Sequence, residues 1–388
     1  MKSFLDSKWL LFLWCVIVVQ FIYIAVSANK QEVDYFVLEN RWQHSQYNLN
    51  QGFEFKGNMW DEDLYVYVSQ AYVRGVDPST LNFEHPPLGK YLIGWGYLLT
   101  RQIMVSQWTA VVVMLIVTYK IGESLGLSKE MSALATSVLS FDPLLYQLGT
   151  KVNLDVIHTA LLLTCLWWLL KYIQFKKQSN KQRYVNELIL GVLLAASLGS
   201  KAVFNGLLLS LFVGVVILGL DRSRSTKEKV FCLIRIYVVT LLGYGLIYGR
   251  FLMLNGLLDF GVLHITMLRF FRSYLPEYPW FEIWRILMVG KWKTWFTDPL
   301  IQPVTEFWWL WPVSLGLSVV GLLKRVKLKG RQFLKSEKPL IMVAGWVGVY
   351  MIYSSIHVVF PRYLLPVLPC LYLMAAKIIQ DYIEFRDS

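Results

Sequence analysis

The chain has 388 residues, of which 56% are hydrophobic and only 16% are charged. Charged side chains make up about a quarter of an average soluble domain, so this composition excludes a soluble globular protein and indicates a polytopic membrane protein. The net charge of +12 does not indicate a nucleic-acid partner. The chain has no nucleic-acid motif, and its lysines and arginines lie in short loops between apolar runs.

The first apolar run, residues 9–28, follows two lysines and is long enough to span a bilayer. We therefore expect an uncleaved first helix with its amino terminus inside. Further apolar runs raise the expected number of transmembrane helices to about ten and return the carboxyl terminus to the starting side. These runs are 106–119, 131–148, 154–170, 187–199, 204–220, 230–252, 307–323, 340–356 and 363–379. The fold class predicted is an all-α polytopic membrane protein with external juxtamembrane amphipathic helices.

The charge of the loops predicts their orientation. The loops at 171–183, 222–229 and 324–338 are rich in lysine and arginine, which favours the inner side of the membrane. Two long segments then fall outside, a first external loop at 29–101 and a second at 255–306. We expect residues 1–388 to form a single transmembrane domain, with no separate soluble domain.

Two acidic motifs lie in the first external loop. The sequence is W-D-E-D at 60–63 and E-H-P-P-L-G-K at 84–90. The pattern between them predicts an amphipathic helix from about residue 62 to 74, with Asp61 as its N-cap and Gly75 as its stop. Such a helix would lie in the membrane interface. The segment after the two prolines would dip into the bilayer without crossing it.

Each of these charges also has an ordinary structural interpretation. Asp61 could merely cap a helix, and Glu62 and Asp63 could merely interact favourably with its dipole. Lys90 could be a lysine that extends to the membrane surface. These interpretations weaken because other polar and charged residues are predicted on the same face, namely Lys151, Asn153, Asp155, Ser200, Lys201, Arg250, Arg269 and Arg362. Cations gathered there could bind an acidic donor, and carboxylates could remove a proton from the other reactant.

Several short motifs resemble a known family. These motifs are D-E at 61–62, H-P-P-L-G-K at 85–90, N-L-D at 153–155, L-G-S-K at 198–201 and P-R-Y-L-L-P at 361–366. Their order and spacing resemble those of the protein O-mannosyltransferases, over roughly residues 9–379. That family belongs to the C-type, polyprenyl-phosphate-sugar-dependent glycosyltransferases, which include the lipid A aminoarabinose transferases.

The resemblance implies transfer of a sugar from a polyprenyl-phosphate carrier to an acceptor hydroxyl on the outer face, with inversion. Asp61 matches the catalytic aspartate, which acts as general base. The substrate-binding residues expected are Glu62, Glu84, His85, Lys90, Lys151, Asp155, Lys201, Arg269 and Arg362. Among them the carboxylates would orient acceptor, sugar or cations. We expect the leaving phosphate to contact Lys151, Lys201 and Arg362.

Two features of the chain leave the acceptor and the role of His85 open. The segment W-K-T-W-F-T-D-P at 292–299 departs from the W-x-x-W-P pattern of the mannosyltransferases, and P-E-Y-P-W at 276–280 replaces their H-P-Y. The acceptor is therefore a protein, a lipid or a cell-wall glycan, and the sugar a hexose or a pentose. His85 either binds sugar or carrier or only holds the loop.

We predict no required metal or other cofactor, with a divalent metal as the alternative. Glu84 and His264 are candidate ligands because lipid A aminoarabinose transferases can hold zinc, but two residues do not make the three or four ligands of a zinc site. The four cysteines are far apart, each inside an apolar run, with no C-x-x-C pair that could bind a metal or form a redox couple. A short prokaryotic enzyme of the plasma membrane is expected. The alternative function is a transporter or flippase of lipid-linked sugars, which would place ionisable residues near mid-membrane and show repeats.

Overall fold

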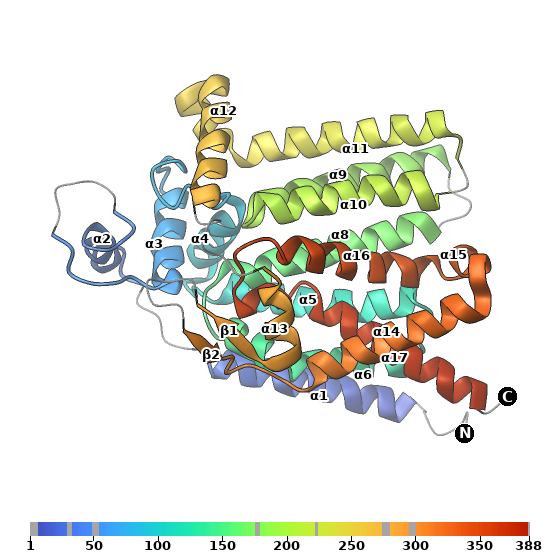
Figure 1. Cartoon of the computed structure of the whole chain (residues 1–388). Helices are drawn as coiled ribbons and strands as arrows, with labels where there is room; N and C mark the ends of the chain where they lie inside the picture. Colours follow the sequence, from blue (N-terminus) through green and yellow to red (C-terminus); the bar gives the residue numbers. More distant parts are fainter. Residues whose placement is uncertain are drawn as a thin grey trace.

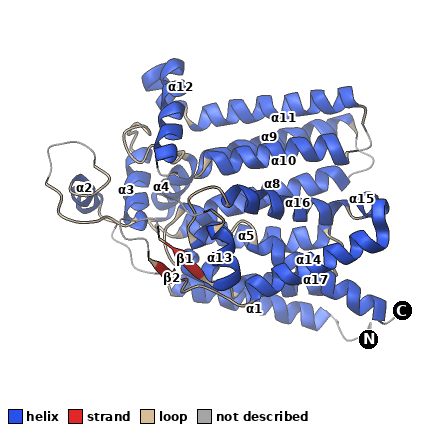
Figure 2. Cartoon of the chain, viewed as in Figure 1, coloured by secondary structure: helices blue, strands red, loops and turns tan. Residues whose placement is uncertain are grey.

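The computed structural model describes residues 7–28, 33–48, 54–174, 179–221, 224–273, 280–294 and 300–386. Helices make up most of the described chain (Figure 2). In the first half these are α1 (Ser7–Val26), α2 (Tyr35–Gln43), α3 (Asp61–Val73), α4 (Leu88–Thr100), α5 (Val105–Ser124), α6 (Lys129–Ser140), α7 (Pro143–Gly149), α8 (Leu154–Gln174) and α9 (Asn180–Ser200). The second half contains α10 (Val203–Leu220), α11 (Thr226–Ile247), α12 (Gly249–Ser273), α13 (Glu282–Val289), β1 (Lys291–Lys293), β2 (Ile301–Pro303), α14 (Leu310–Lys329), η2 (Gly330–Gln332), α15 (Phe333–Ser336), α16 (Lys338–Ser354), η3 (Pro361–Leu364) and α17 (Leu368–Arg386).

The long helices lie side by side, and the two ends of this bundle differ (Figure 1). One end, here called the site end, carries α2, α3, α4, α12, α13 and the β1–β2 hairpin. The opposite end, here called the basic end, holds the start of α1, the end of α17 and the helix α15. Lysine- and arginine-rich segments therefore lie away from the acidic motifs, as the charge pattern predicts.

Six described helices have the length and apolar composition of membrane spans. These are α1, α5, α8, α10, α11 and α12. Length alone misleads for α12, because it runs across the ends of the other helices in Figure 1. The α12 helix is interrupted by a kink at Gly256, whose φ of 81° and ψ of 179° are not helical.

One span expected from the sequence is divided in two. The apolar run 131–148 forms α6 and α7, which meet at Asp142. The Asp142 carboxylate accepts the backbone N–H groups of Leu144 and Leu145, and Pro143 takes the first helical position. A capping aspartate followed by proline starts a new helix, so the apolar run cannot continue as one.

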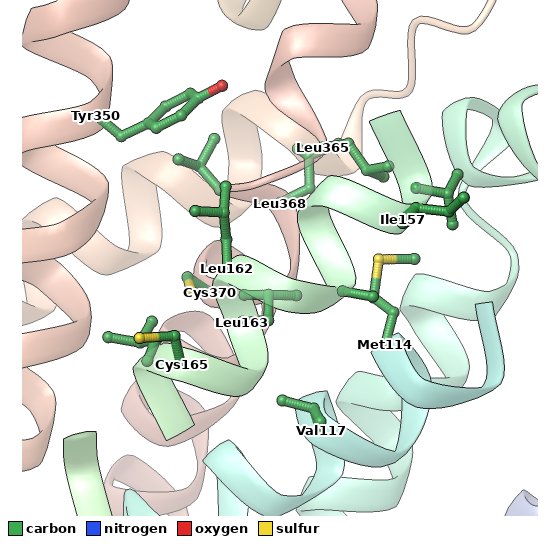
Figure 3. Packing of buried hydrophobic residues seen from close by; sticks show 14 of the residues in the cluster. Met114, Val117, Ile157, Leu162, Leu163, Cys165, Tyr350, Leu365, Leu368 and Cys370 are labelled. Atoms are coloured by element: carbon green, nitrogen blue, oxygen red, sulfur yellow. The ribbon is translucent and has the colours of Figure 1, made fainter. Parts of the chain in front are cut away.

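The core of the bundle lies between α5, α8, α16 and α17 (Figure 3). Met114 of α5, Leu163 of α8 and Leu368 of α17 are fully enclosed there, and Tyr350 of α16 closes one side. Interiors of this kind are close-packed, so the helices have little freedom to shift against each other. The core therefore provides a rigid base for the polar residues at the site end.

The prediction of an amphipathic helix near residues 62–74 is right about the helix but wrong about its environment. Every residue of α3 from Leu64 to Tyr72 is buried, because α3 packs against α4 on one side and α2 on another. Gly94 of α4 allows this close packing, since a Cβ atom there would lie 2.4 Å from the Ser69 carbonyl oxygen. As predicted, Gly75 follows the end of α3, with a φ of 90° that suits glycine.

The β1–β2 hairpin is an element that the sequence did not predict. Its two short strands pair antiparallel, with Trp292 opposite Gln302. The Trp292 indole donates a hydrogen bond to the Val359 carbonyl at 3.1 Å, so the hairpin is fixed beside η3. The rest of the segment 292–299, from residue 295 on, lies outside the described residues, as does 276–279.

Candidate active site

Asp61 is the first residue of α3, and its carboxylate faces two donors from distant parts of the chain. Tyr47 donates its hydroxyl to Asp61 Oδ1 at 2.8 Å, and Arg362 donates to Oδ2 at 2.8 Å. The predicted capping role is wrong, because Trp60 occupies the N-cap position and no side chain caps the helix. Asp61 is therefore held by tertiary contacts, at the positive end of a helix dipole.

A second carboxylate lies behind Arg362. Asp155 Oδ2 is 3.6 Å from Arg362 Nε, and Asp155 Oδ1 accepts a hydrogen bond from Lys201 Nζ. The Lys201 and Asp155 side chains are only 4% and 7% exposed, whereas Asp61 is 30% exposed. Alternating charges thus run from the buried Lys201 through Asp155 and Arg362 to Asp61 at the water boundary. We call these four residues the charge chain.

Local structure explains where Asp155 and Lys201 lie. The Asn153 side-chain oxygen accepts the backbone N–H groups of Asp155 and Val156 and so caps the start of α8. Lys201 follows the last residue of α9, where a φ of −152° and ψ of −56° end the helix. The motifs N-L-D and L-G-S-K thus meet because α8 begins, and α9 ends, at the site end of the bundle. The Lys201 ammonium also lies 5.0 Å from the centre of the Tyr363 ring, beside Arg362.

Lys90 braces the loop that carries the second acidic motif. Its side chain is buried, with 0% exposure, so the alternative of a lysine that extends to the membrane surface does not apply. Lys90 Nζ donates to the carbonyl oxygens of Asn82 and His85, each at 2.7 Å, and to Asn82 Oδ1 at 3.1 Å. These acceptors all belong to the loop, so Lys90 holds the loop in position, and its contact with a substrate stays a prediction.

Glu84 and His85 occupy the same loop, and burial shifts the pKa values of the two groups in opposite directions. Burial raises the pKa of Glu84, although Lys90 opposes this rise, and the Asn82 amide donates to its carboxylate. Burial, followed by the charges of Lys201 and Lys90, lowers the pKa of His85 to about 3. His85 is therefore neutral at pH 7, and its Nδ1–H donates to the Lys201 carbonyl at 3.0 Å. This geometry favours the loop-holding role of His85 and gives the carrier phosphate no cation there.

The glycine of H-P-P-L-G-K is required by close packing. A Cβ atom on Gly89 would lie 2.4 Å from the Ser200 carbonyl oxygen and 2.9 Å from Leu154 Cδ2. Distances this short force either the backbone of α4 or the end of α9 to move. The glycine therefore lets α4 approach the residue next to Lys201.

We expect Gly89→Ala to lower the free energy of unfolding by about 1–3 kcal/mol, the usual cost of overpacking. Thermal unfolding of the purified protein in detergent measures the change. Gly316→Ala in α14 is the matched control, because nothing lies within 4 Å of a Cβ atom there, and alanine favours a helix over glycine. Equal unfolding temperatures for the two variants would contradict the packing argument.

The electrostatics of the charge chain keep Asp61 ionised. Burial by itself would raise the pKa of Asp61, but the Arg362 charge and the hydrogen bonds from Tyr47 and Arg362 hold the pKa below its usual value. The pKa of Arg362 is raised because Asp155 and Asp61 outweigh its burial. Burial lowers the pKa of Lys201 to about 8, although Asp155 opposes this shift. At neutral pH all four groups are predominantly charged.

The other predicted residues fall into two groups. Glu62 lies next to the charge chain, where its carboxylate is 3.3 Å from Lys151 Nζ and both side chains are partly exposed. Asp63 pairs more loosely with Arg41 at 3.5 Å. Arg269 is exposed on α12 and forms no ion pair with any residue that the structure describes. The structure therefore brings Lys151 to the site but not Arg269.

Tyr47 is a residue of the candidate site that sequence reasoning missed. It lies between α2 and α3, and burial followed by the neighbouring Asp61 raises its pKa, so the hydroxyl remains a donor. The one signal in the sequence was its place fourteen residues before Asp61 in the same loop. A lone tyrosine in a long loop gives no direction for its hydroxyl, so that signal was too weak.

A metal centre was the alternative considered for Glu84 and His264. Both ring nitrogens of His264 lie within hydrogen-bond distance, Nε2 of the Tyr244 hydroxyl and Nδ1 of the Phe260 carbonyl, each at 2.8 Å. Within the described part of the chain, no three His, Cys, Asp or Glu side chains gather as ligands would. His264 thus belongs to an aromatic cluster of α11 and α12 in this structure.

Comparisons with known proteins bear on the family and the fold. A family model described as dolichyl-phosphate-mannose-protein mannosyltransferase matches residues 84–245, a range that includes Asp155 and Lys201 but neither Asp61 nor Arg362. No curated protein sequence matches the chain. The predicted resemblance to the C-type, polyprenyl-phosphate-sugar-dependent glycosyltransferases is confirmed by this model together with similar solved structures.

Two of these structures show the shared fold. ArnT from Cupriavidus metallidurans, bound to undecaprenyl phosphate, is 16% identical with a TM-score of 0.61, covering 97% of this chain and 60% of ArnT. The Archaeoglobus fulgidus oligosaccharyltransferase, tethered to an acceptor peptide with an NVT sequon, is 12% identical with a TM-score of 0.51, covering 99% of this chain and 51% of that enzyme. The chain thus spans between half and three fifths of their lengths. The predicted fold class, a helical polytopic membrane protein, is confirmed.

Proposed function

We propose that this chain is an inverting glycosyltransferase that moves a sugar from a polyprenyl-phosphate carrier to an acceptor hydroxyl, with Asp61 as the general base. The observation that carries the proposal is the partly exposed Asp61 carboxylate, held ionised by Tyr47 and Arg362. A base must be ionised, accessible and fixed in direction, and this carboxylate meets each condition. The position of the charge chain at the end opposite the basic loops supports a reaction on the outer face of a plasma membrane.

The reaction can be written with the residues of the site in defined roles. The acceptor oxygen attacks the anomeric carbon of the sugar, and Asp61 takes the hydroxyl proton. The bond between that carbon and the carrier phosphate breaks, and the polyprenyl phosphate leaves with the electron pair. Cations near the phosphate stabilise its growing negative charge.

The accessible cations near Asp61 suit the leaving phosphate better than the buried one. Lys151 and Arg362 are 37% and 24% exposed, whereas Lys201 is buried and already paired with Asp155. We infer that Lys151 and Arg362 contact the phosphate. Lys201 would then act indirectly, by holding Asp155 against Arg362.

The donor and acceptor classes are the less constrained part of the proposal. The family description favours a mannose-type donor and a protein acceptor, so the chain is most like a protein O-mannosyltransferase. ArnT bound to undecaprenyl phosphate supports a polyprenyl-phosphate carrier, and the peptide-tethered oligosaccharyltransferase supports a protein acceptor. A lipid or a cell-wall glycan remains the alternative acceptor, to be distinguished in the assay.

The test is to incubate the purified protein with polyprenyl-phosphate mannose or other polyprenyl-phosphate sugars. Peptides containing serine and threonine, lipids and cell-wall glycans serve as acceptors, and mass spectrometry detects free polyprenyl phosphate and glycosylated product. We expect both products to appear together. If no donor and acceptor pair releases polyprenyl phosphate, while proteoliposomes move the labelled donor across the bilayer, the chain is a flippase instead.

Tyr47→Phe is expected to move the acidic limb of the kcat profile to higher pH. The Tyr47 hydroxyl stabilises the ionised form of Asp61, so its loss raises the pKa of the base. The base then becomes protonated, and inactive, at a higher pH than in the wild type. Profiles of kcat against pH measure this shift. Tyr382→Phe at the basic end is the control, and identical limbs for Tyr47→Phe and the wild type would exclude the role of Tyr47.

A further inference from the structure

A polar pocket lies at the site end, and none of the four residues of the charge chain lines it. It has a volume of about 280 Å³ and lies between the start of α2 and the ends of α3 and α4. Tyr35, Gln70, Arg74, Tyr97 and Arg101 are among its lining residues. Neither the glycosyl transfer argued above nor the motifs of the sequence use this pocket.

Two arginines give the pocket its character. Arg74 and Arg101 follow the ends of α3 and α4, and neither forms an ion pair with any residue in the described ranges. The Arg74 guanidinium lies over the Tyr35 ring, with Cζ 3.9 Å from the ring centre, and Arg74 lines the pocket. Asp34 also lines the pocket, and its Oδ1 accepts the backbone N–H groups at the start of α2. Two guanidinium forks against one capping carboxylate favour a phosphate ligand.

An apolar surface continues from the arginines along α4. Trp95, Leu98 and Leu99 are 49%, 48% and 85% exposed, and Leu98 also lines the pocket. Exposed leucines beside a tryptophan at the end of a transmembrane bundle are typical of the bilayer interface. A ligand that fits both features has a negatively charged phosphate and hydrocarbon chains.

The pocket is separate from the proposed site of sugar transfer. Arg74 follows Asp61 by 13 residues in the same helical segment, which corresponds to about 20 Å along the axis. A phosphate bound at Arg74 therefore cannot be the phosphate that leaves during transfer next to Asp61. A ligand held by Arg74 is therefore distinct from the reacting donor.

We propose that this pocket binds the headgroup phosphate of an anionic membrane phospholipid, with its acyl chains against Leu98 and Leu99. The bound phosphate would contact residues at the ends of α3 and α4 and at the start of α2, and so hold these three helices together. Asp61 lies on α3 and Lys90 lies on α4, so the lipid would stabilise the helices that position the active site. This inference does not depend on the proposed transferase activity.

The test uses the full chain in nanodiscs of phosphatidylcholine, with phosphatidylglycerol added in steps. Native mass spectrometry counts bound phosphatidylglycerol, and the unfolding temperature reports bracing. We expect wild type to retain phosphatidylglycerol at least about tenfold more tightly than Arg74→Gln/Arg101→Gln. The control Arg272→Gln/Lys291→Gln removes two exposed cations from the same end outside this pocket, and it should behave as wild type.

Two results would overturn the proposal. Equal retention by the wild type and the Arg74→Gln/Arg101→Gln variant would show that the pocket holds no phospholipid. Inorganic phosphate that raises the unfolding temperature as much as phosphatidylglycerol would show a site for free phosphate instead. If the double variant does not fold, Arg101→Gln alone decides the question, because this exposed side chain follows the end of α4 and has no partner among the described residues.

Discussion

Asp61→Asn is expected to lower kcat for sugar transfer by about 10²- to 10⁴-fold, the usual contribution of a general base. The amide has the shape of the carboxylate but cannot accept the acceptor proton. It also faces Arg362 with one oxygen at most, so the contact that fixes its direction weakens. Single-turnover release of polyprenyl phosphate measures the chemical step without interference from product release.

The matched control for Asp61→Asn is Asp63→Asn. Both residues lie in the first turn of α3, and both changes remove one negative charge. The Asp63 carboxylate lies 3.5 Å from Arg41, in a partly exposed pair, and such pairs contribute little. We expect Asp63→Asn to retain kcat within about threefold, since removing a group that does not take part in proton transfer leaves the barrier unchanged. If both variants lose kcat equally, the loss comes from removing a negative charge at the start of α3, and Asp61 is not the base.

The sequence predicted the membrane class, the helical fold and the separation of the basic loops from the acidic motifs, which lie at opposite ends of the bundle. Apolar runs of spanning length are a strong signal because lipid forces the backbone to satisfy its own hydrogen bonds. The motifs also brought together Asp61, Asp155, Lys201 and Arg362, whose positions differ by up to about three hundred residues. Here the resemblance to a family supplied what spacing alone could not, since nothing local in P-R-Y-L-L-P indicates a partner for Asp61.

The sequence could not predict which charges are buried. Lys90 and Lys201 read like lysines at a membrane edge, yet both are enclosed and bonded inward. The α3 segment has an amphipathic pattern, yet α2 and α4 cover both of its sides. Burial of this kind arises from how α2, α3, α4 and the ends of α8 and α9 pack together. The periodicity of apolar residues in a sequence shows which face of a helix is apolar. It does not show which other helices pack against that helix.

Lys201→Met is expected to lower the free energy of unfolding by about 3–5 kcal/mol, because it leaves the buried Asp155 carboxylate without its direct partner. Arg362 Nε, at 3.6 Å from Asp155 Oδ2, only partly replaces it. The wild-type stability also depends on pH through Lys201, whose pKa of about 8 lies below its ordinary value of 10.5. Between these values the unfolded chain binds more protons, so stability from this group rises with pH. Lys201→Met lacks this rise.

Replacing both members of the pair separates stability from catalysis. In Asp155→Leu/Lys201→Met no buried charge is left alone, and Arg362 still pairs with Asp61, so most of the lost stability should return. Lys120→Met is the control, since its pair with Glu123 is exposed and is worth about 0–1 kcal/mol. If the stable double variant still transfers sugar slowly, Asp155 and Lys201 position Arg362 against Asp61. Transfer at the wild-type rate would instead assign this pair to folding alone, and would leave Tyr47 and Arg362 as the groups that hold the base.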